Sequence, residues 1–452
     1  MKKLLTVLLS VLMILSLAAC STNNGGNEGT EELSEFDQLI ADTTAEFYNE
    51  VADAIVDAEK VNVTKGDIIT ELTEPVTITI WNTYYSAQQE AFQKMVDTFN
   101  ASQDMITVNY EVQAYQDYDT NLLNAVRNGE GPNITNRYTS TAAQYVNDGL
   151  IANLQPYIDD PTIGIPNYST SLIGKVYNEA SQWGQGSIYV FPILETSEVL
   201  YINMDIYNEL GLSVPKTWEE LTENCKKIYE AKGMPGWGSD SETDTMIDRV
   251  MQLGSGYINA ETLEQEIDEE AFKTALAWYA EGIKDGYFRM AGADMYHSGP
   301  FTNGLVASYI GSSAGSSYVI PYCDFELKVT CIPQSGSETF APAWGGGWVC
   351  FDSTPEENLA SYIFMKYILT NEDNACADFC LVFGAVPVYK EALNSAYFQD
   401  AIKDDVVMQA LMETAPNINI VNSIPGADNV RNAFGYAIDT IAALYADEAA
   451  AE

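Results

Sequence analysis

The stretch FTNGLVASYIGSSAGSS, residues 301–317, decides how we interpret the rest of the chain. Its middle, Val306 to Ile310, is a short apolar run that predicts a buried parallel strand between two helices. Behind this strand, Ser312 and Ser313 open the second helix, where hydroxyls and backbone N–H groups favour an anion or a polar oxygen. The same pattern is typical of an ordinary capped helix, so this stretch alone leaves both interpretations open.

The composition predicts a large globular protein and excludes several classes of partner. With 452 residues, of which 46% are hydrophobic, the chain has room for more than one lobe. It carries 65 acidic and 21 basic residues, a net charge of -44, which argues against nucleic acid and against an anionic membrane surface. The single histidine, His297, excludes zinc sites built on several histidines, and we expect it in a loop, exposed or partly packed. We expect no metal and no cofactor.

The first 20 residues are typical of a secretory signal. Two lysines precede an apolar run that ends in Leu17-Ala18-Ala19-Cys20, which resembles a bacterial lipobox with Cys20 as the lipidated residue. Residues 21–75 follow as a tether, with an amphipathic helix expected within residues 33–60. These features predict a protein anchored by lipid to the cell membrane and facing outside the cytoplasm.

Six further cysteines are scattered along the chain without a CxxC pair. Such cysteines are usually small core residues, whereas an extracytoplasmic location permits disulfides. The spacing leaves their pairing open.

Strands and helices alternate after residue 75. Strands are expected at 76–81 and 106–112, helices at 86–100 and 118–128, and a third strand after Pro132. This alternation predicts a mostly parallel sheet, in which ligands bind beyond the carboxyl ends of the strands. The polar residues expected there are Asn82, Tyr84, Tyr85, Arg137, Tyr138 and Thr139.

Residues 188–221 carry the most specific pattern. Two strands flank a polar kink, and Pro215-Lys216-Thr217-Trp218 then opens a helix with a capping box from Thr217 to Glu220. This passage resembles the crossover of extracellular solute-binding proteins of ABC importers, in the carbohydrate-type family that includes maltose-binding and glycerol-3-phosphate-binding proteins. Further stretches of the same family pattern are similar to residues 80–100, 301–317, 341–348, 366–370 and 384–388, so the resemblance runs from about residue 76 to 447.

The resemblance implies an α/β, two-lobed periplasmic-binding-protein-like fold with hinge crossovers and a ligand cleft between the lobes. The first lobe would comprise residues 76–200 and return at 341–371. The second would comprise residues 201–340 and the C-terminal helices of 372–452. The implied partners are a small solute and the transmembrane subunits of an ABC permease, and we expect a monomer.

The expected ligand contacts are aromatic platforms together with hydroxyl and carboxylate groups. Arg431 lies where the family contacts its ligand, and it could equally pair with a carboxylate of this acidic chain. The full expected set is Tyr84, Tyr138, Glu195, Thr196, Ser197, Trp237, Asp240, Ser312, Ser313, Trp344, Gly346, Trp348 and Arg431.

The solute itself stays open at this point. We place a sugar or oligosaccharide first. Glycerol 3-phosphate or a glycerophosphodiester comes second, because Gly311-Ser312-Ser313 and Arg431 resemble the phosphate-contacting parts of that branch, while Ala385 replaces its tyrosine. A surface glycoside hydrolase working with two carboxylates, or an adhesin, is the alternative of another class.

Overall fold

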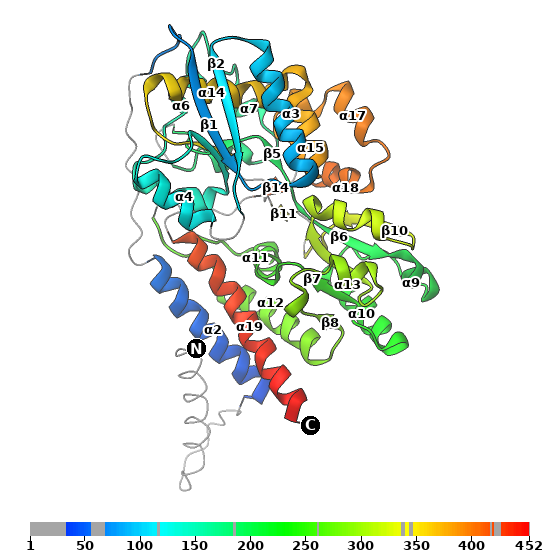
Figure 1. Cartoon of the computed structure of the whole chain (residues 1–452). Coiled ribbons are helices and arrows are strands. Elements are labelled where there is room, and N and C mark those ends of the chain that lie inside the picture. Colours follow the sequence, from blue (N-terminus) through cyan, green and yellow to red (C-terminus); the bar gives the residue numbers. More distant parts are fainter. Residues whose placement is uncertain are drawn as a thin grey trace, which may run out of the picture. The chain divides into compact units, whose positions relative to one another are not determined.

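The computed structural model describes residues 33–55, 68–114, 118–183, 187–259, 262–335, 340–342, 347–415, 418–419 and 426–451 (Figure 1). The chain divides into two units, residues 1–39 and 40–452. In the first unit, the Ser34 hydroxyl accepts a hydrogen bond from the Asp37 backbone N–H at 3.1 Å, where helix α2 (Glu35–Ile55) begins. All elements below belong to the second unit. No helix in the described residues combines the length and the apolar character needed to cross a membrane.

The first sheet has five strands in the order β2 (Ile106–Val112), β1 (Val76–Asn82), β3 (Ile134–Arg137), β12 (Gly347–Cys350) and β4 (Phe191–Pro192). β1 pairs in parallel with β2 and β3, as the alternation of strands and helices predicts, whereas β12 runs antiparallel to β3 and β4. The bounds expected for the second strand, 106–112, are confirmed.

Helices cover this sheet through apolar faces with helical spacing. α3 (Ser86–Ser102) buries Phe92, Met95, Val96 and Phe99, and it lies beside β1 and β2 in Figure 1. α14 (Pro355–Leu369) packs on β1 and begins with a capping box between Thr354 and Glu357. The remaining helices around this sheet are α4 (Tyr118–Arg127), α5 (Thr139–Asn147), α6 (Gln155–Asp159), α7 (Tyr168–Ser171), α8 (Val176–Ala180), η4 (Glu372–Asn374), α15 (Ala375–Phe383), α16 (Lys390–Leu393) and α17 (Ala396–Ile402).

The second sheet has the order β10 (Leu327–Cys331), β6 (Glu198–Asn203), β9 (Ser308–Ser312), β7 (Trp237–Ser239) and β8 (Phe288–Arg289). The strand expected at Val306 to Ile310 is β9, which begins two residues later and pairs in parallel with β7 but antiparallel with β6. Its neighbouring helices are α9 (Met204–Glu209), α10 (Trp218–Lys232), α11 (Glu242–Gln252), α12 (Glu269–Lys284), η1 (Gly292–Asp294), α13 (Ser298–Thr302), η2 (Ser313–Tyr318), η3 (Ile320–Tyr322), α18 (Val406–Thr414) and α19 (Ala427–Ala451).

Short strands mark where the chain passes between the two sheets. β5 (Leu194–Glu195) joins β4 to β6 and pairs with β13 (Val386–Pro387). β11 (Ala341–Pro342) lies between β10 and β12 and pairs with β14 (Ile418–Asn419). Beyond residue 371, α15 packs on α3 and α14 beside the first sheet, whereas α18 packs on β10 and α19 packs on α11 and α12 beside the second.

The capping box expected at Thr217 is half formed. The Thr217 hydroxyl accepts a hydrogen bond from the Glu220 backbone N–H at 3.2 Å. The Glu220 carboxylate accepts in return from the Lys216 backbone N–H at 2.7 Å, one residue before the cap. The helix still begins where the pattern predicts.

All six described cysteines outside the signal are free thiols. Cys376 and Cys380 lie one turn apart on α15, fully buried, with their sulfur atoms 3.9 Å apart. Four of the six are buried, as expected for small core residues.

The part of α2 that belongs to the second unit contributes to its core. The Phe47 ring stacks on that of Phe272 of α12 at 3.9 Å between centroids, and it meets Phe434 of α19 edge-on at 4.7 Å. The amphipathic helix expected within residues 33–60 is thus confirmed over Glu35–Ile55, and its residues 40–55 belong to the second unit.

We therefore expect Phe47→Ala to lower the free energy of unfolding by about 3–5 kcal/mol, since it leaves a cavity between two aromatic rings. Chemical denaturation measures this change. Glu46→Ala, on the exposed side of the same helix, is the matched control and should leave the denaturation midpoint unchanged. Equal midpoints for the two variants would contradict a core role for α2.

Candidate functional site

The crossover before β6 brings together two of the predicted polar stretches. Ser197 and Ser313 are buried, and the Ser313 backbone N–H donates to the Ser197 carbonyl at 3.0 Å. In return, the Ser197 backbone N–H donates to the Ser313 hydroxyl at 3.4 Å. The Ser197 hydroxyl also donates to the Pro342 carbonyl of β11 at 2.8 Å, so this residue touches both passages between the sheets. Glu195 and Thr196 are buried beside it.

Ser312 caps the element that follows β9. Its hydroxyl accepts from the Ala314 backbone N–H at 3.3 Å, and its carbonyl accepts from the Tyr201 hydroxyl at 3.1 Å. The helix that the serine-rich turn predicts is the short 3₁₀-helix η2 (Ser313–Tyr318). The hydroxyl of Ser312 is therefore used within the chain, as in the ordinary-cap interpretation.

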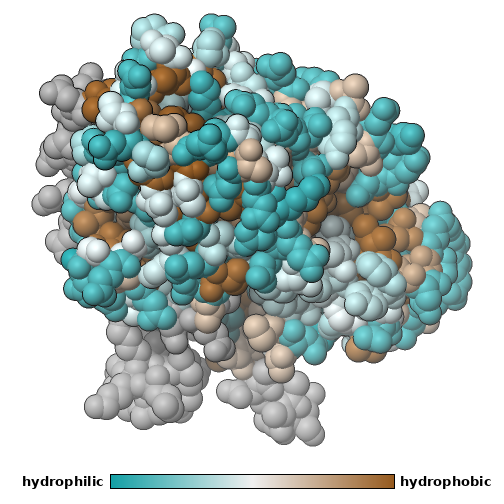
Figure 2. All heavy atoms as spheres, turned by 45° about the horizontal axis from the view of Figure 1, so that its top comes forward, coloured by the Kyte–Doolittle hydropathy of each residue, from teal (hydrophilic) through white to brown (hydrophobic). Residues whose placement is uncertain are grey.

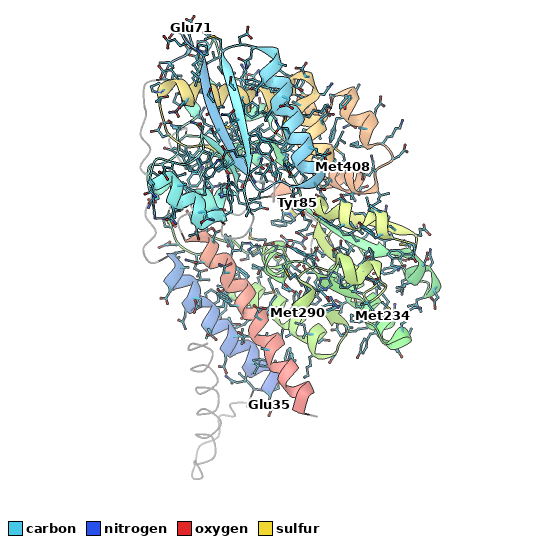
Figure 3. All side chains as sticks on the ribbon, in the orientation of Figure 1. Glu35, Glu71, Tyr85, Met234, Met290 and Met408 are labelled. Carbon is cyan, nitrogen blue, oxygen red and sulfur yellow. The ribbon has the colours of Figure 1, made fainter. Side chains whose placement is uncertain are left out.

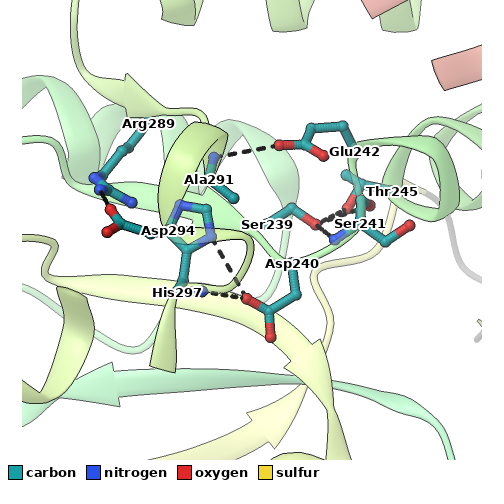
Figure 4. A network of polar contacts seen from close by, with 9 residues as sticks. All are labelled: Ser239, Asp240, Ser241, Glu242, Thr245, Arg289, Ala291, Asp294 and His297. Carbon is teal, nitrogen blue, oxygen red and sulfur yellow. Dashed lines mark hydrogen bonds and ion pairs between the residues drawn. The ribbon is translucent and has the colours of Figure 1, made fainter. Parts of the chain in front are cut away.

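Asp240 follows β7 and is held by the segment that contains the only histidine (Figure 4). The Asp240 carboxylate accepts from the His297 backbone N–H at 2.6 Å, and the imidazole Nδ1 lies 3.5 Å from the same oxygen. His297 is fully buried, so its expected exposed or partly packed position is wrong. The reason is close packing, because a Cβ on Gly238 would lie 2.2 Å from the imidazole Nε2. The ring thus fills the space that the glycine leaves.

Arg431, at the beginning of α19, forms a two-pronged ion pair with Asp244. The guanidinium Nε and Nη2 lie 2.9 and 2.7 Å from the two carboxylate oxygens. Of the two interpretations left open by the sequence, the structure shows the pairing with a carboxylate. A bidentate pair of this kind is strong and fixes the orientation of both side chains.

Two more carboxyl groups are buried beside this pair. Glu198 of β6 and Asp248 of α11 each have one carboxylate oxygen with no hydrogen-bond partner among the described residues. Burial raises the pKa of Glu198 well above its ordinary value, and the nearby Asp244 and Asp240 raise it further against the opposing effect of Arg431. Burial likewise raises the pKa of Asp248, with Glu198 adding to the effect. Both groups therefore favour the neutral, protonated form.

Three of the expected aromatic platforms lie in the core. Trp237 is fully buried among Trp218, Trp278 and Phe288, and its ring face is covered. Trp348 packs against Phe92 and Phe364. The Tyr84 ring packs among Phe92, Phe379 and Phe383. We therefore leave these three rings out of the candidate site. Trp344 and Gly346 lie outside the described residues.

Three tyrosines of the candidate region are exposed to solvent. Tyr85, at the N-terminal end of α3 (Figure 3), is exposed, and its hydroxyl shares a hydrogen bond with that of Tyr318 in η2. This hydrogen bond, together with partial burial, raises the pKa of Tyr318 to about 12, so its hydroxyl stays neutral at physiological pH. Tyr138, from the expected set, is also exposed. Tyr318 was not predicted, although it follows the serines of the decisive stretch directly.

No group of three or more His, Cys, Asp or Glu side chains in the described part of the chain could hold a metal ion. The arrangement provides acceptor oxygens, hydroxyls and exposed aromatic rings. These groups can recognise a polar solute through hydrogen bonds and stacking.

The sequence matches a family model described as a bacterial extracellular solute-binding protein over residues 94–410. The sn-glycerol-3-phosphate-binding periplasmic protein of Rhizobium meliloti is 23% identical over 252 residues, which are 52% of this chain and 58% of that protein. The protein of the same name from Yersinia pestis is 21% identical over 373 residues, 75% of this chain and 81% of that protein. The chain thus spans less than two thirds of the first relative and most of the second.

Solved structures with a similar fold include the cyclic alpha-maltosyl-1,6-maltose binding protein of Arthrobacter globiformis, at 18% identity and a TM-score of 0.67. That match covers 82% of this chain and 99% of the other. UgpB of Mycobacterium tuberculosis in complex with glycerophosphocholine matches at 17% identity, with a TM-score of 0.66 and coverage of 82% and 99%. The sugar-binding protein MalE of Xanthomonas citri matches at 15% identity, with a TM-score of 0.66 and coverage of 82% and 98%. The expected two-lobed α/β fold is confirmed.

Glu198→Gln should change how stability depends on pH. Because the pKa of Glu198 is raised in the folded state, the folded protein holds a proton that the unfolded chain releases above its ordinary pKa of 4.5. The wild-type free energy of unfolding should therefore fall as pH rises from about 4.5 towards the folded-state pKa. The Gln variant has no proton to release at this position, so its free energy of unfolding should not show this decrease.

Chemical denaturation of both proteins from pH 4 to 8 measures the effect. The stability of Glu198→Gln relative to wild type should increase with pH, and Glu223→Gln at an exposed position of α10 should run parallel to wild type. A constant difference between Glu198→Gln and wild type across this range would contradict the raised pKa.

Proposed function

Because the chain belongs to the bacterial extracellular solute-binding proteins, the binding components of ABC importers, we propose that it captures a neutral carbohydrate and delivers it to a membrane permease. Its site would comprise the exposed tyrosines Tyr85, Tyr138 and Tyr318, with Asp240 as an acceptor for hydroxyl groups. The solute would bind between the two sheet-bearing lobes, and the protein would act as a monomer. The protein would bind its solute without converting it chemically, so we expect no turnover.

The ion pair between Arg431 and Asp244 is the observation that favours a neutral solute. A phosphate dianion is bound most strongly by cations whose charge is not already compensated. The two arginines near the expected contacts each face a carboxylate: Arg431 faces Asp244, and Arg137 faces Asp119 at 3.0 Å. A neutral sugar needs only hydrogen bonds and stacking surfaces.

Glycerol 3-phosphate or a glycerophosphodiester is the second candidate. The sn-glycerol-3-phosphate-binding relatives favour it, at 21–23% identity. Two further outcomes would point to other classes of protein. Release of product from a glycoside would support a surface hydrolase, and binding of a polymer or host protein without any small solute would support an adhesin.

A thermal-shift screen of the tether-trimmed protein, retaining residues from 33 onward, tests the proposed ligand class. We expect mono- or oligosaccharides to raise the melting temperature, since a ligand that binds only the folded state stabilises it by mass action. Glycerol 3-phosphate and glycerophosphocholine should have no effect. A shift with the glycerol phosphates alone would replace the carbohydrate proposal by the second candidate.

For the carbohydrate identified in the screen, Tyr85→Ala should weaken binding by about 5- to 10-fold, the usual contribution of one stacked aromatic ring. Calorimetry measures the dissociation constant. Tyr229→Ala, at an exposed tyrosine of α10 outside the proposed site, is the matched control and should bind like wild type. If both variants bind like wild type, the tyrosines named here do not form the site.

We also propose that Cys20 is lipidated and holds the protein at the outer side of the cell membrane. Residues 1–32 lie outside the described residues, so this proposal rests on the lipobox pattern Leu17 to Cys20. Cys20→Ser should move the protein from the membrane fraction to the soluble extracytoplasmic fraction, as followed by immunoblotting after detergent-free fractionation. Ser21→Ala is the control. Retention of Cys20→Ser in the membrane fraction would contradict a lipid anchor at this residue.

A further inference from the structure

One long segment of this acidic chain carries no Asp, Glu, Lys or Arg. It runs from Met295 to Tyr322, while charged residues make up 19% of the whole chain and give it a net charge of -44. The segment includes α13, β9, η2 and η3. A partner of this segment therefore meets neutral side chains in a protein that otherwise repels anions.

The same segment exposes large aromatic and apolar side chains. Tyr296, Tyr318 and Tyr322 are 56%, 49% and 67% exposed, and Met295 and Ile320 are exposed beside them in sequence. On the face drawn in Figure 2, hydrophilic residues predominate and hydrophobic residues gather in separate patches. Large apolar side chains that gather on one exposed surface mark binding surfaces more often than singly scattered ones.

One hydrogen bond and the packing of neighbouring elements relate these tyrosines to the proposed site. The Tyr318 hydroxyl shares a hydrogen bond with that of Tyr85. Tyr296 lies two residues before α13, which packs on η2, and Tyr322 ends η3, which also packs on η2. We call Tyr85, Tyr296, Tyr318 and Tyr322 the tyrosine face. It is continuous with the proposed site through Tyr85.

The chemistry of the tyrosine face suits a chain of sugar rings. A tyrosine ring stacks on the C–H face of a pyranose, and its hydroxyl donates to or accepts from the sugar hydroxyls at the rim. One pyranose has two faces and can cover at most two such rings, so a monosaccharide would leave much of the tyrosine face in water. A linear oligosaccharide can cover several of these rings in succession.

We infer that the tyrosine face binds a linear oligosaccharide of three or more rings, and that solutes of this length class are what the protein captures. This inference rests on the proposed function, since it specifies the carbohydrate that the site takes. Tyr85 and Tyr318 bind the rings nearest the candidate site, and Tyr296 and Tyr322 bind the rings farther along the chain.

Calorimetric titration of the tether-trimmed protein with oligosaccharide ladders tests the length class. The probes are the malto-, cello-, xylo- and manno-oligosaccharides from one to six rings. For the ladder that binds, we expect the dissociation constant to fall by at least 10-fold between one ring and four rings, and then to level off.

Single variants test the tyrosine face itself. Tyr322→Ala should weaken binding of the six-ring member by about 5- to 10-fold and leave binding of the shortest member that binds unchanged. Tyr322→Phe keeps the ring and should stay within about 3-fold of wild type. Tyr229→Ala should match wild type with every probe. Melting temperatures of all variants report whether they fold.

The outcomes separate the two proposals. Binding of a monosaccharide as tightly as of its six-ring homologue, or six-ring binding unaffected by both Tyr322→Ala and Tyr296→Ala, overturns the inference and leaves the carbohydrate-binding function intact. Failure of all four ladders overturns both. Self-association that sedimentation detects in wild type and that Tyr322→Ala abolishes would assign the tyrosine face to a contact between copies of the chain and overturn the inference.

Discussion

The reciprocal hydrogen bonds between Ser197 and Ser313 are the constraint on which the arrangement of the second unit depends. They tie the passage from the first sheet to the second directly to the end of β9, and the Ser197 hydroxyl adds a bond to Pro342 in the return passage. Groups that are buried and fully used in this way cannot also move freely to a ligand without leaving a partner unsatisfied. The crossover is therefore better suited to positioning its neighbours than to contacting the solute with every predicted hydroxyl.

Much of the fold could be predicted because its signals are local. The βα alternation placed the first strands and helices, and β2 has the predicted bounds, since a short alternating strand between two polar turns leaves little choice of register. The beginning of β9 was harder to predict. Val306 and Ala307 are as apolar as a strand should be, but they precede the ladder that β9 forms with β6.

The candidate site was harder to predict because residue type does not determine which way a side chain faces. Tyr84 and Tyr85 are adjacent and chemically identical, yet one packs among phenylalanines and the other is exposed. Trp237 has the composition of a sugar platform, but its strand is covered on both faces and its ring is enclosed by other aromatic side chains. Which of two like residues meets the solvent depends on packing from distant elements such as α15. No local pattern records that packing.

The surplus of acid over base has a thermodynamic consequence beyond ligand choice. A formal charge of -44 counts every carboxyl group as ionised, whereas burial keeps Glu198 and Asp248 disposed to hold their protons in the folded state. These protons are released to the medium when the chain unfolds at a pH between the two sets of pKa values. The heat of unfolding measured by calorimetry will then contain the ionisation heat of the buffer, so a protein of this kind yields different apparent enthalpies in phosphate and in Tris.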